Sequence, residues 1–166
     1  MKGLKLFGSK TYVGIDLGHH TIKVVQLDRT GTGWRIFKVG KTLTPVDAIK
    51  EGVVIDPTAV GLALKQVLSD SHIGANSAFV GVSGGAVVVR TVRIPKMEEP
   101  TLRKSIKYEA SRYVPSSVED SYIEFEIMGY AEDDQMDVLI VAAPKELVES
   151  RIKACALAGL HVEAVD

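Results

Sequence analysis

The first part of the chain alternates apolar and polar positions with a period of two, which is typical of half-buried β-strands. Two such runs, Tyr12–Leu17 and Ile22–Leu27, are separated by four residues and predict an antiparallel pair. Trp34–Leu43 follows a Gly-Thr-Gly turn and predicts the third strand of a meander. A helix is then expected to begin with Asp56 as its N-cap and Pro57 at its first helical position.

A second series of elements begins near Val87 and predicts the order strand, helix, strand, strand, helix, strand, which is the split β-α-β-β-α-β arrangement. Its expected ranges are Ala86–Ile94, Glu98–Tyr113, Tyr122–Tyr130, Asp137–Ala143, Lys145–Ala158 and His161–Val165. Because no Pro, Gly or Ser-rich linker separates the two series, we expect two packed subdomains. The predicted division is a flexible segment 1–10, a first subdomain 11–86, and a second subdomain with a return strand over 87–166. The fold class is mixed α/β.

The composition and net charge of the chain argue against some classes of function. The chain has 166 residues, 46% of them hydrophobic and 25% charged, which is the balance of a folded domain and not of a disordered one. A formal net charge of −1 gives no overall attraction to nucleic acid or to anionic lipid. The single cysteine, Cys155, lies on the inward stripe of its predicted helix, so we expect a core residue rather than a nucleophile.

Candidate chemistry lies between the first two strands. Asp16 lies near the end of the first strand, Gly18 allows the turn, and Lys23 lies on the returning strand. Backbone N–H groups of such a turn can converge on phosphate oxygens, while Asp16 can hold a hydrated Mg²⁺ and Lys23 a terminal phosphate. The alternative is a plain hairpin whose Asp16 bonds its own backbone. The motif alone does not decide between them.

Longer segments add a family resemblance. Asp16, Gly18 and Lys23, placed between two apolar strands, resemble the first phosphate loop of the actin-like ATPase superfamily. Three further segments, in this order, resemble PilM-type pilus assembly proteins, which are relatives of the cell-division protein FtsA: Glu51–Pro57, Ile94–Met97 and Lys107–Pro115. The resemblance extends from about residue 12 to residue 166. It departs from the family pattern where His19 and His20 replace small hydroxyl residues.

The resemblance implies an actin-like first lobe with an inserted β-α-β-β-α-β subdomain. It also implies a site for ATP and Mg²⁺, with Mg²⁺ held through water by Asp16, and with these nucleotide-binding residues: Asp16, Gly18, His19, His20, Thr21 and Lys23. Adjacent histidines project in different directions and no further ligand lies near, so His19 and His20 are read as loop residues and not as metal ligands. PilM-type proteins have a second lobe that completes this site. With half of the site present, we expect this chain alone to bind no nucleotide.

The resemblance further implies a cytoplasmic scaffold of the type IV pilus inner-membrane platform, peripheral to the membrane through its partner. In that family, a groove between the two subdomains holds the N-terminal peptide of PilN, a membrane protein. The candidate wall residues here are Ile94, Pro95, Met97, Tyr108 and Arg112, for which ordinary packing is the alternative. Two rival functions stay open. One is an ATPase or sugar kinase of the same superfamily, and the other is an FtsA-like self-assembling cytoskeletal protein.

Overall fold

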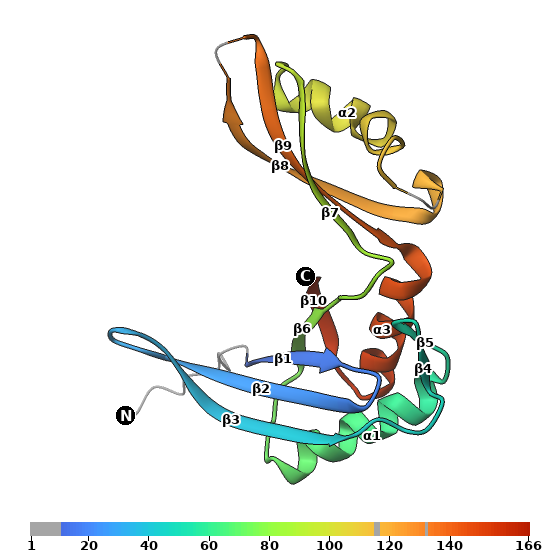
Figure 1. Ribbon diagram of the computed structural model, residues 1–166. Coiled ribbons are helices and arrows are strands. Elements are labelled where there is room, and N and C mark those ends of the chain that lie inside the picture. The colour runs from blue at the N-terminus through green and yellow to red at the C-terminus, as the bar shows by residue number, and fades with distance from the viewer. Residues whose placement is uncertain (1–10, 115–116, 132) are drawn as a thin grey trace, which may run out of the picture. The chain divides into compact units, whose positions relative to one another are not determined.

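The computed structural model describes residues 11–114, 117–131 and 133–166 (Figure 1). The predicted flexible segment 1–10 lies outside the described residues. Two compact units are present. The first unit extends to Val82 and includes Glu149–Asp166, and the second unit is Ser83–Val148.

A five-stranded sheet with the order β10-β6-β1-β2-β3 forms the centre of the first unit. Its strands, in chain order, are β1 (Tyr12–Leu17), β2 (Thr21–Thr30), β3 (Gly33–Leu43), β6 (Ser77–Gly81) and β10 (His161–Val165). The predicted antiparallel meander of the first three strands is confirmed, and β6 runs parallel to β1. Strands β4 (Ile49–Lys50) and β5 (Val53–Val54) form a separate short pair.

Helix α1 (Pro57–Asp70) begins where the sequence predicts. Asp56 Oδ1 accepts a hydrogen bond of 2.9 Å from the Ala59 N–H, which satisfies one of the donors that a helix leaves open at its N-terminus. The apolar stripe of α1, including Val60 and Leu64, packs with the inward side chains of β1 and β2 in one buried core. The helix therefore covers one face of the sheet.

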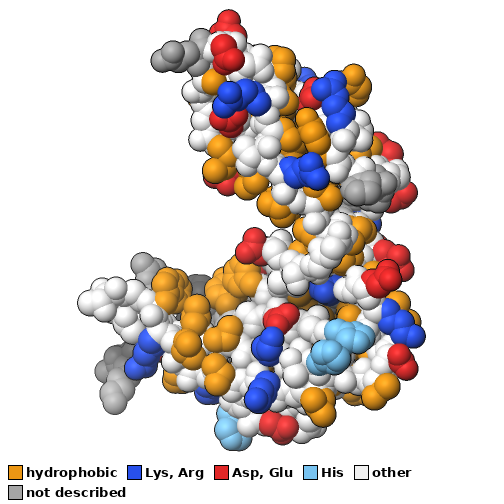
Figure 2. All heavy atoms as spheres, in the orientation of Figure 1, with side chains coloured by type: hydrophobic (Ala, Val, Ile, Leu, Met, Phe, Trp, Pro, Cys, Tyr) orange, Lys and Arg blue, Asp and Glu red, His pale blue; other side chains and the backbone are white. Residues whose placement is uncertain are grey.

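The opposite face of this sheet carries exposed apolar side chains. Tyr12 and Phe79 lie on neighbouring strands with their ring centroids 5.3 Å apart, and both rings are partly open to solvent. Leu27, Trp34, Ile36, Phe37 and Val39 are also exposed. Figure 2 shows hydrophobic side chains gathered over β2 and β3. The first unit thus has a covered face and an apolar open face.

The second unit is a three-stranded sheet with the order β7-β9-β8 and one helix. Its elements are β7 (Val88–Pro95), α2 (Glu99–Ala110), the 3₁₀ turn η1 (Val118–Asp120), β8 (Ser121–Tyr130) and β9 (Gln135–Pro144). Leu102 and Ile106 of α2 share a buried core with Val92, Met136 and Ile140 of the sheet. One face of this sheet is therefore covered by α2.

The end of the second predicted series differs in its packing. The order of its six elements is confirmed, but helix α3 (Lys145–Leu157) contributes Ala154 and Cys155 to the first unit's core, and β10 pairs in parallel with β6. The second unit therefore ends at Val148, and the prediction that it extends to residue 166 is wrong. Periodicity identifies a strand, but it does not identify the sheet that the strand joins. No helix in the described ranges is long and apolar enough to cross a membrane.

Candidate functional site

Two of the predicted site residues meet across β1 and β2. Asp16 and Lys23 are direct partners in the antiparallel register, and Lys23 Nζ donates to Asp16 Oδ2 over 2.9 Å. Their side chains are 53% and 60% exposed. An exposed pair of this kind contributes about 0–1 kcal/mol, so it can open at little cost when a ligand competes for either charge. The structure thus places a cation and a carboxylate at the open face of the sheet.

The turn between these strands is tight and well supported. The Gly18 N–H donates to the Thr21 carbonyl over 3.1 Å, and a Cβ on Gly18 would lie 2.8 Å from that same oxygen. Only glycine fits this approach without a shift of the backbone. Thr44 fixes the turn from β3's end, because its hydroxyl donates to the Gly18 carbonyl (2.7 Å) and its N–H to the His20 carbonyl (3.0 Å).

His19 joins the turn to the β4–β5 pair. Its Nδ1 lies 2.8 Å from the Ile49 carbonyl, which can only accept, so this nitrogen carries the proton. The His20 ring lies edge-on to it, with centroids 4.7 Å apart. Arg151 of α3 supports the same segment by donating to the Gly52 carbonyl. Burial lowers the pKa of the Arg151 guanidinium from its usual range, and the charge of Asp16 opposes this effect.

A hollow of about 750 Å³ opens on the sheet face beside Asp16 and Lys23. Its lining includes Lys41 of β3 and Gly81 of β6. In the strand register, Lys41 lies opposite Lys23, and Gly81 lies opposite Asp16. Asp166 also lines the hollow and is held against β6, since its carbonyl accepts from the Val82 N–H. The turn residues Gly18, His19, His20 and Thr21 lie outside this lining.

Lys41, Gly81 and Asp166 were missed by the sequence analysis. Lys41 comes next to Lys23 through the meander, and Gly81 next to Asp16 through parallel pairing. The sequence predicted the strand that carries Lys41, but only the pairing register of β2 and β3 shows that Lys41 lies opposite Lys23. Gly81 and Asp166 reach the hollow only through long-range parallel pairing, for which the sequence has no local pattern.

The chemistry that these groups support is anion binding. In the hollow, Lys23 and Lys41 supply positive charge beside the carboxylates of Asp16 and Asp166. In the adjoining turn, the backbone N–H groups of His19 and His20 donate to no backbone acceptor in the described part of the chain. Such groups fit phosphate oxygens. Across the described residues, no group of three or more His, Cys, Asp or Glu side chains could hold a metal ion directly. Contact between Asp16 and Mg²⁺ through a bound water molecule is not tested by this result and stays a prediction.

The predicted peptide wall divides into two groups. Ile94 is buried, Pro95 is exposed and Met97 is half-buried, with its Sδ 3.7 Å from Ser105 Oγ. Tyr108 and Arg112 lie toward the other end of α2, where the guanidinium of Arg112 is 5.4 Å from the Tyr108 ring centre. The Tyr108 side chain, and secondarily Glu109, raises the pKa of Arg112.

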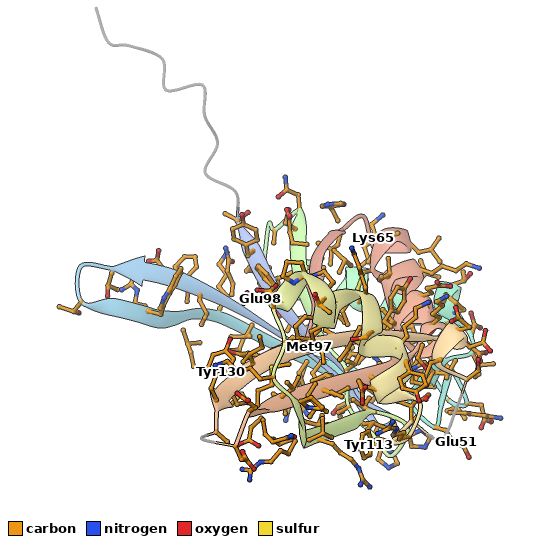
Figure 3. All side chains as sticks on the ribbon, turned by 90° about the horizontal axis from the view of Figure 1, so that it is seen from above. Glu51, Lys65, Met97, Glu98, Tyr113 and Tyr130 are labelled. Carbon is orange, nitrogen blue, oxygen red and sulfur yellow. The ribbon has the colours of Figure 1, made fainter. Side chains whose placement is uncertain are left out.

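These two groups are separated along the helix. At 1.5 Å per residue, the helical rise from Glu99 to Tyr108 is about 14 Å. Figure 3 shows Met97 beside Glu98 before α2, with Tyr113 beyond its other end. All five residues belong to the second unit. The structure therefore does not bring them together in one cluster, and Pro95 and Met97 form the more compact candidate.

Comparison with known proteins adds to this geometry. A family model described as type IV pilus assembly protein PilM matches residues 14–166. Among solved structures, a chain of a PilM–PilN type IV pilus biogenesis complex is 24% identical with a TM-score of 0.84, covering 93% of this chain and 46% of that one. The cytoplasmic domain of EpsL, an inner membrane component of the Vibrio cholerae type II secretion system, is 12% identical with a TM-score of 0.60.

The second match covers 94% of this chain and 57% of the EpsL chain, so this chain spans about half the length of both. At these identities the structural matches establish the fold. They confirm the mixed α/β class that the order of the predicted strands and helices indicates.

Proposed function

Since this chain belongs to the PilM family of type IV pilus assembly proteins, we propose that it is a scaffold that binds an extended segment of a PilN-like membrane protein. The observation that carries this proposal is the family match, which includes nearly all of both units. The solved relative comes from a PilM–PilN complex, which supports the choice of partner. Such a partner would hold the chain at the cytoplasmic side of the inner membrane.

The link between β7 and α2 is the proposed point of contact. Met97 is half-buried against the second unit's core, so part of its side chain stays available to a partner. Pro95, two residues before Met97, is exposed. Ile94 is only 3% exposed and anchors the start of this link in the core of the second unit. An apolar side chain from an extended partner segment can cover the remaining surface of Met97.

The expected affinity is modest. A segment of a few residues buries little apolar area, and at about 25 cal/mol per Å² most of the gain offsets the cost of ordering the segment. We therefore expect a Kd of order micromolar for the labelled N-terminal peptide of a PilN-like protein, titrated by fluorescence anisotropy. Met97→Glu should weaken binding at least about tenfold, because it places a charge against an apolar contact.

Met128→Glu is the matched control, since Met128 is a largely exposed methionine on β8 of the same unit. It introduces the same charge away from the link and should bind like the parent. Met97→Leu should also bind like the parent, and thermal unfolding of each variant checks that the fold is kept. Equal binding by Met97→Glu and the parent would show that the contact lies elsewhere or that the partner is wrong.

We also propose that longer forms of this protein bind ATP and Mg²⁺ at the open sheet face. The Asp16–Lys23 pair and Lys41 support this, because they offer charges suited to phosphates and Mg²⁺. The backbone N–H groups of His19 and His20, in the turn that adjoins this face, are further donors for phosphate oxygens. Bound Mg²⁺ would neutralise phosphate charge. In this arrangement Asp16 would hold water of the hydrated ion, which requires release of Lys23 to the phosphate. Calorimetry of such a form with ATP and Mg²⁺, compared with its Asp16→Ala variant, tests this proposal.

A further inference from the structure

A second recess lies in the second unit, away from the Pro95–Met97 link. It has a volume of about 460 Å³ and is lined by residues of α2 and β8 together with Lys145 at the start of α3. None of the five residues of the predicted peptide wall lines it. We call this recess the α2–β8 groove, and its lining side chains are of two kinds.

The rim of the groove is cationic. Four basic side chains line it, namely Arg103, Lys104, Lys107 and Lys145. Arg103 and Lys107 are paired at 2.9 Å with Glu99 and Glu119, whose side chains are 59% and 72% exposed. Exposed pairs of this kind are weak and exchange readily for another carboxylate.

The two other cations have open positions for a ligand. Lys104 is exposed and forms no ion pair with any described residue. Lys145 Nζ donates to the backbone carbonyl of Glu119 over 2.7 Å, which uses one of its three N–H donors, and its charge also acts on the Glu119 carboxylate, which is ion-paired with Lys107. A ligand carboxylate at either lysine would therefore gain a charge-assisted contact.

The floor of the groove is apolar. Ile106 of α2 is buried, and Ile123 and Phe125 of β8 are half-buried. The Arg103 guanidinium lies 4.9 Å from the centre of the Phe125 ring, which holds this cation above the floor. Figure 2 shows Lys and Arg side chains interspersed with hydrophobic ones on the second unit. The matching ligand has an apolar group between negative charges.

The strand beside the groove is suited to an extended ligand. In the order β7-β9-β8, strand β8 is at the edge of the sheet. An edge strand presents backbone N–H and C=O groups on its outer side, and a peptide can add to it as a further strand. Alternate side chains of such a peptide would then point toward the floor and toward solvent.

We infer that the α2–β8 groove docks a short acidic segment of a partner protein, extended along β8, with an apolar side chain on the floor and carboxylates at Lys104 and Lys145. The neighbouring carboxylates favour this over a continuous polyanion. Glu99, Glu119 and Glu124 flank the rim and would repel the evenly spaced phosphates of a nucleic acid. This inference is independent of PilN-like binding at Met97.

The test uses the whole chain and a fluorescein-labelled hexapeptide of alternating glutamate and leucine as the probe. We expect saturable binding by anisotropy that weakens with added salt, because the contacts include exposed charges. A hexapeptide of alternating lysine and leucine, and one of alternating glutamate and serine, should each bind at least about tenfold more weakly, since each lacks one of the two matching features. Equal binding by either would overturn the inference.

Variants locate the site. The double variant Lys104→Glu, Lys145→Glu should weaken binding at least about tenfold, whereas Lys153→Glu, an exposed lysine of α3 outside the groove, should not. Bound peptide should also slow hydrogen exchange at β8 amides in the parent. Unchanged binding by a folded double variant would overturn the inference. Displacement of the peptide by an oligonucleotide or by anionic phosphatidylserine vesicles, at equal charge concentration, would overturn the protein-segment assignment.

Discussion

Asp16 and Lys23 neutralise each other across the first two strands, with Lys23 Nζ 2.9 Å from Asp16 Oδ2 and both side chains more than half exposed. The sequence indicated these two residues for different tasks, a magnesium contact and a phosphate contact. Their pairing means that a nucleotide must compete with an existing ion pair. Because the pair is exposed, that competition costs little.

Asp16→Ala should therefore leave the fold almost unchanged. We expect a loss of less than about 1 kcal/mol in the free energy of unfolding, measured by urea denaturation. Asp56→Ala provides a comparison, because it removes the hydrogen bond that caps α1 and should cost about 1 kcal/mol. A loss well above that of Asp56→Ala would show that Asp16 has a structural role that its exposed pair does not account for.

Gly18→Ala should be more damaging than either change. The new Cβ would lie 2.8 Å from the Thr21 carbonyl oxygen, which is backbone and cannot rotate away, so the turn must shift. We expect a loss of about 1–3 kcal/mol in unfolding free energy. Gly31→Ala, in the next turn, meets no atom within 4 Å and should change stability by less than about 0.5 kcal/mol. Similar losses for both variants would contradict this account of the turn.

The Cys155 thiol should be inert in the folded protein. It is fully buried, and burial raises its pKa to about 12, so the reactive thiolate is not formed near neutral pH. A thiol-specific reagent such as Ellman's reagent should react at pH 8 only after unfolding. Rapid reaction of the native protein would show that α3 opens from the first unit.

The same pKa shift predicts a pH dependence of stability. An unfolded cysteine loses its proton near pH 8.5, whereas the folded thiol keeps its proton until about pH 12. Between these values the folded state binds more protons, so stability from this group is complete below about pH 8.5 and falls as pH rises. Urea midpoints from pH 8 to 10.5 should therefore fall more steeply for the parent than for Cys155→Ala, and parallel curves would count against the shift.

The chain alone should bind no ATP that calorimetry can detect in the presence of Mg²⁺. In the described residues, the charged groups at the open hollow come from one sheet face, and a phosphate held on one side stays largely solvated. A micromolar Kd would contradict this expectation. In a longer form that does bind ATP, Asp16→Ala should weaken Mg²⁺-dependent binding.

Local patterns predicted those features whose causes are local. Alternation predicted the meander, and Asp56-Pro57 predicted the start of α1. Local patterns did not predict the pairing register of β2 and β3. A bulge after Gln26 shifts the pairing so that Lys23 faces Lys41; without that shift Lys23 would face Gly40 instead. Lys41 therefore joins the hollow because of one irregularity in β2 and β3.

Pairing between strands that are far apart in the sequence was the second feature that the sequence did not predict. The helix and strand near the C-terminal end were predicted within a few residues, but not their return to the first unit, which depends on β10 finding β6. Resemblance to PilM-type proteins supplied the family, which is confirmed. The predicted helix Glu98–Tyr113 already placed Met97 and Tyr108 far apart along its axis, and the resemblance grouped them nonetheless.

Hydrogen exchange tests the central claim most directly. The whole chain is measured by mass spectrometry with and without the cytoplasmic N-terminal segment of a PilN-like protein at saturating concentration. We predict slower exchange in the link from Ile94 through the first turn of α2, and loss of that protection in Met97→Glu but not in Met128→Glu. Absence of binding, or protection confined to the first unit while the link exchanges unchanged, would contradict the proposed scaffold site.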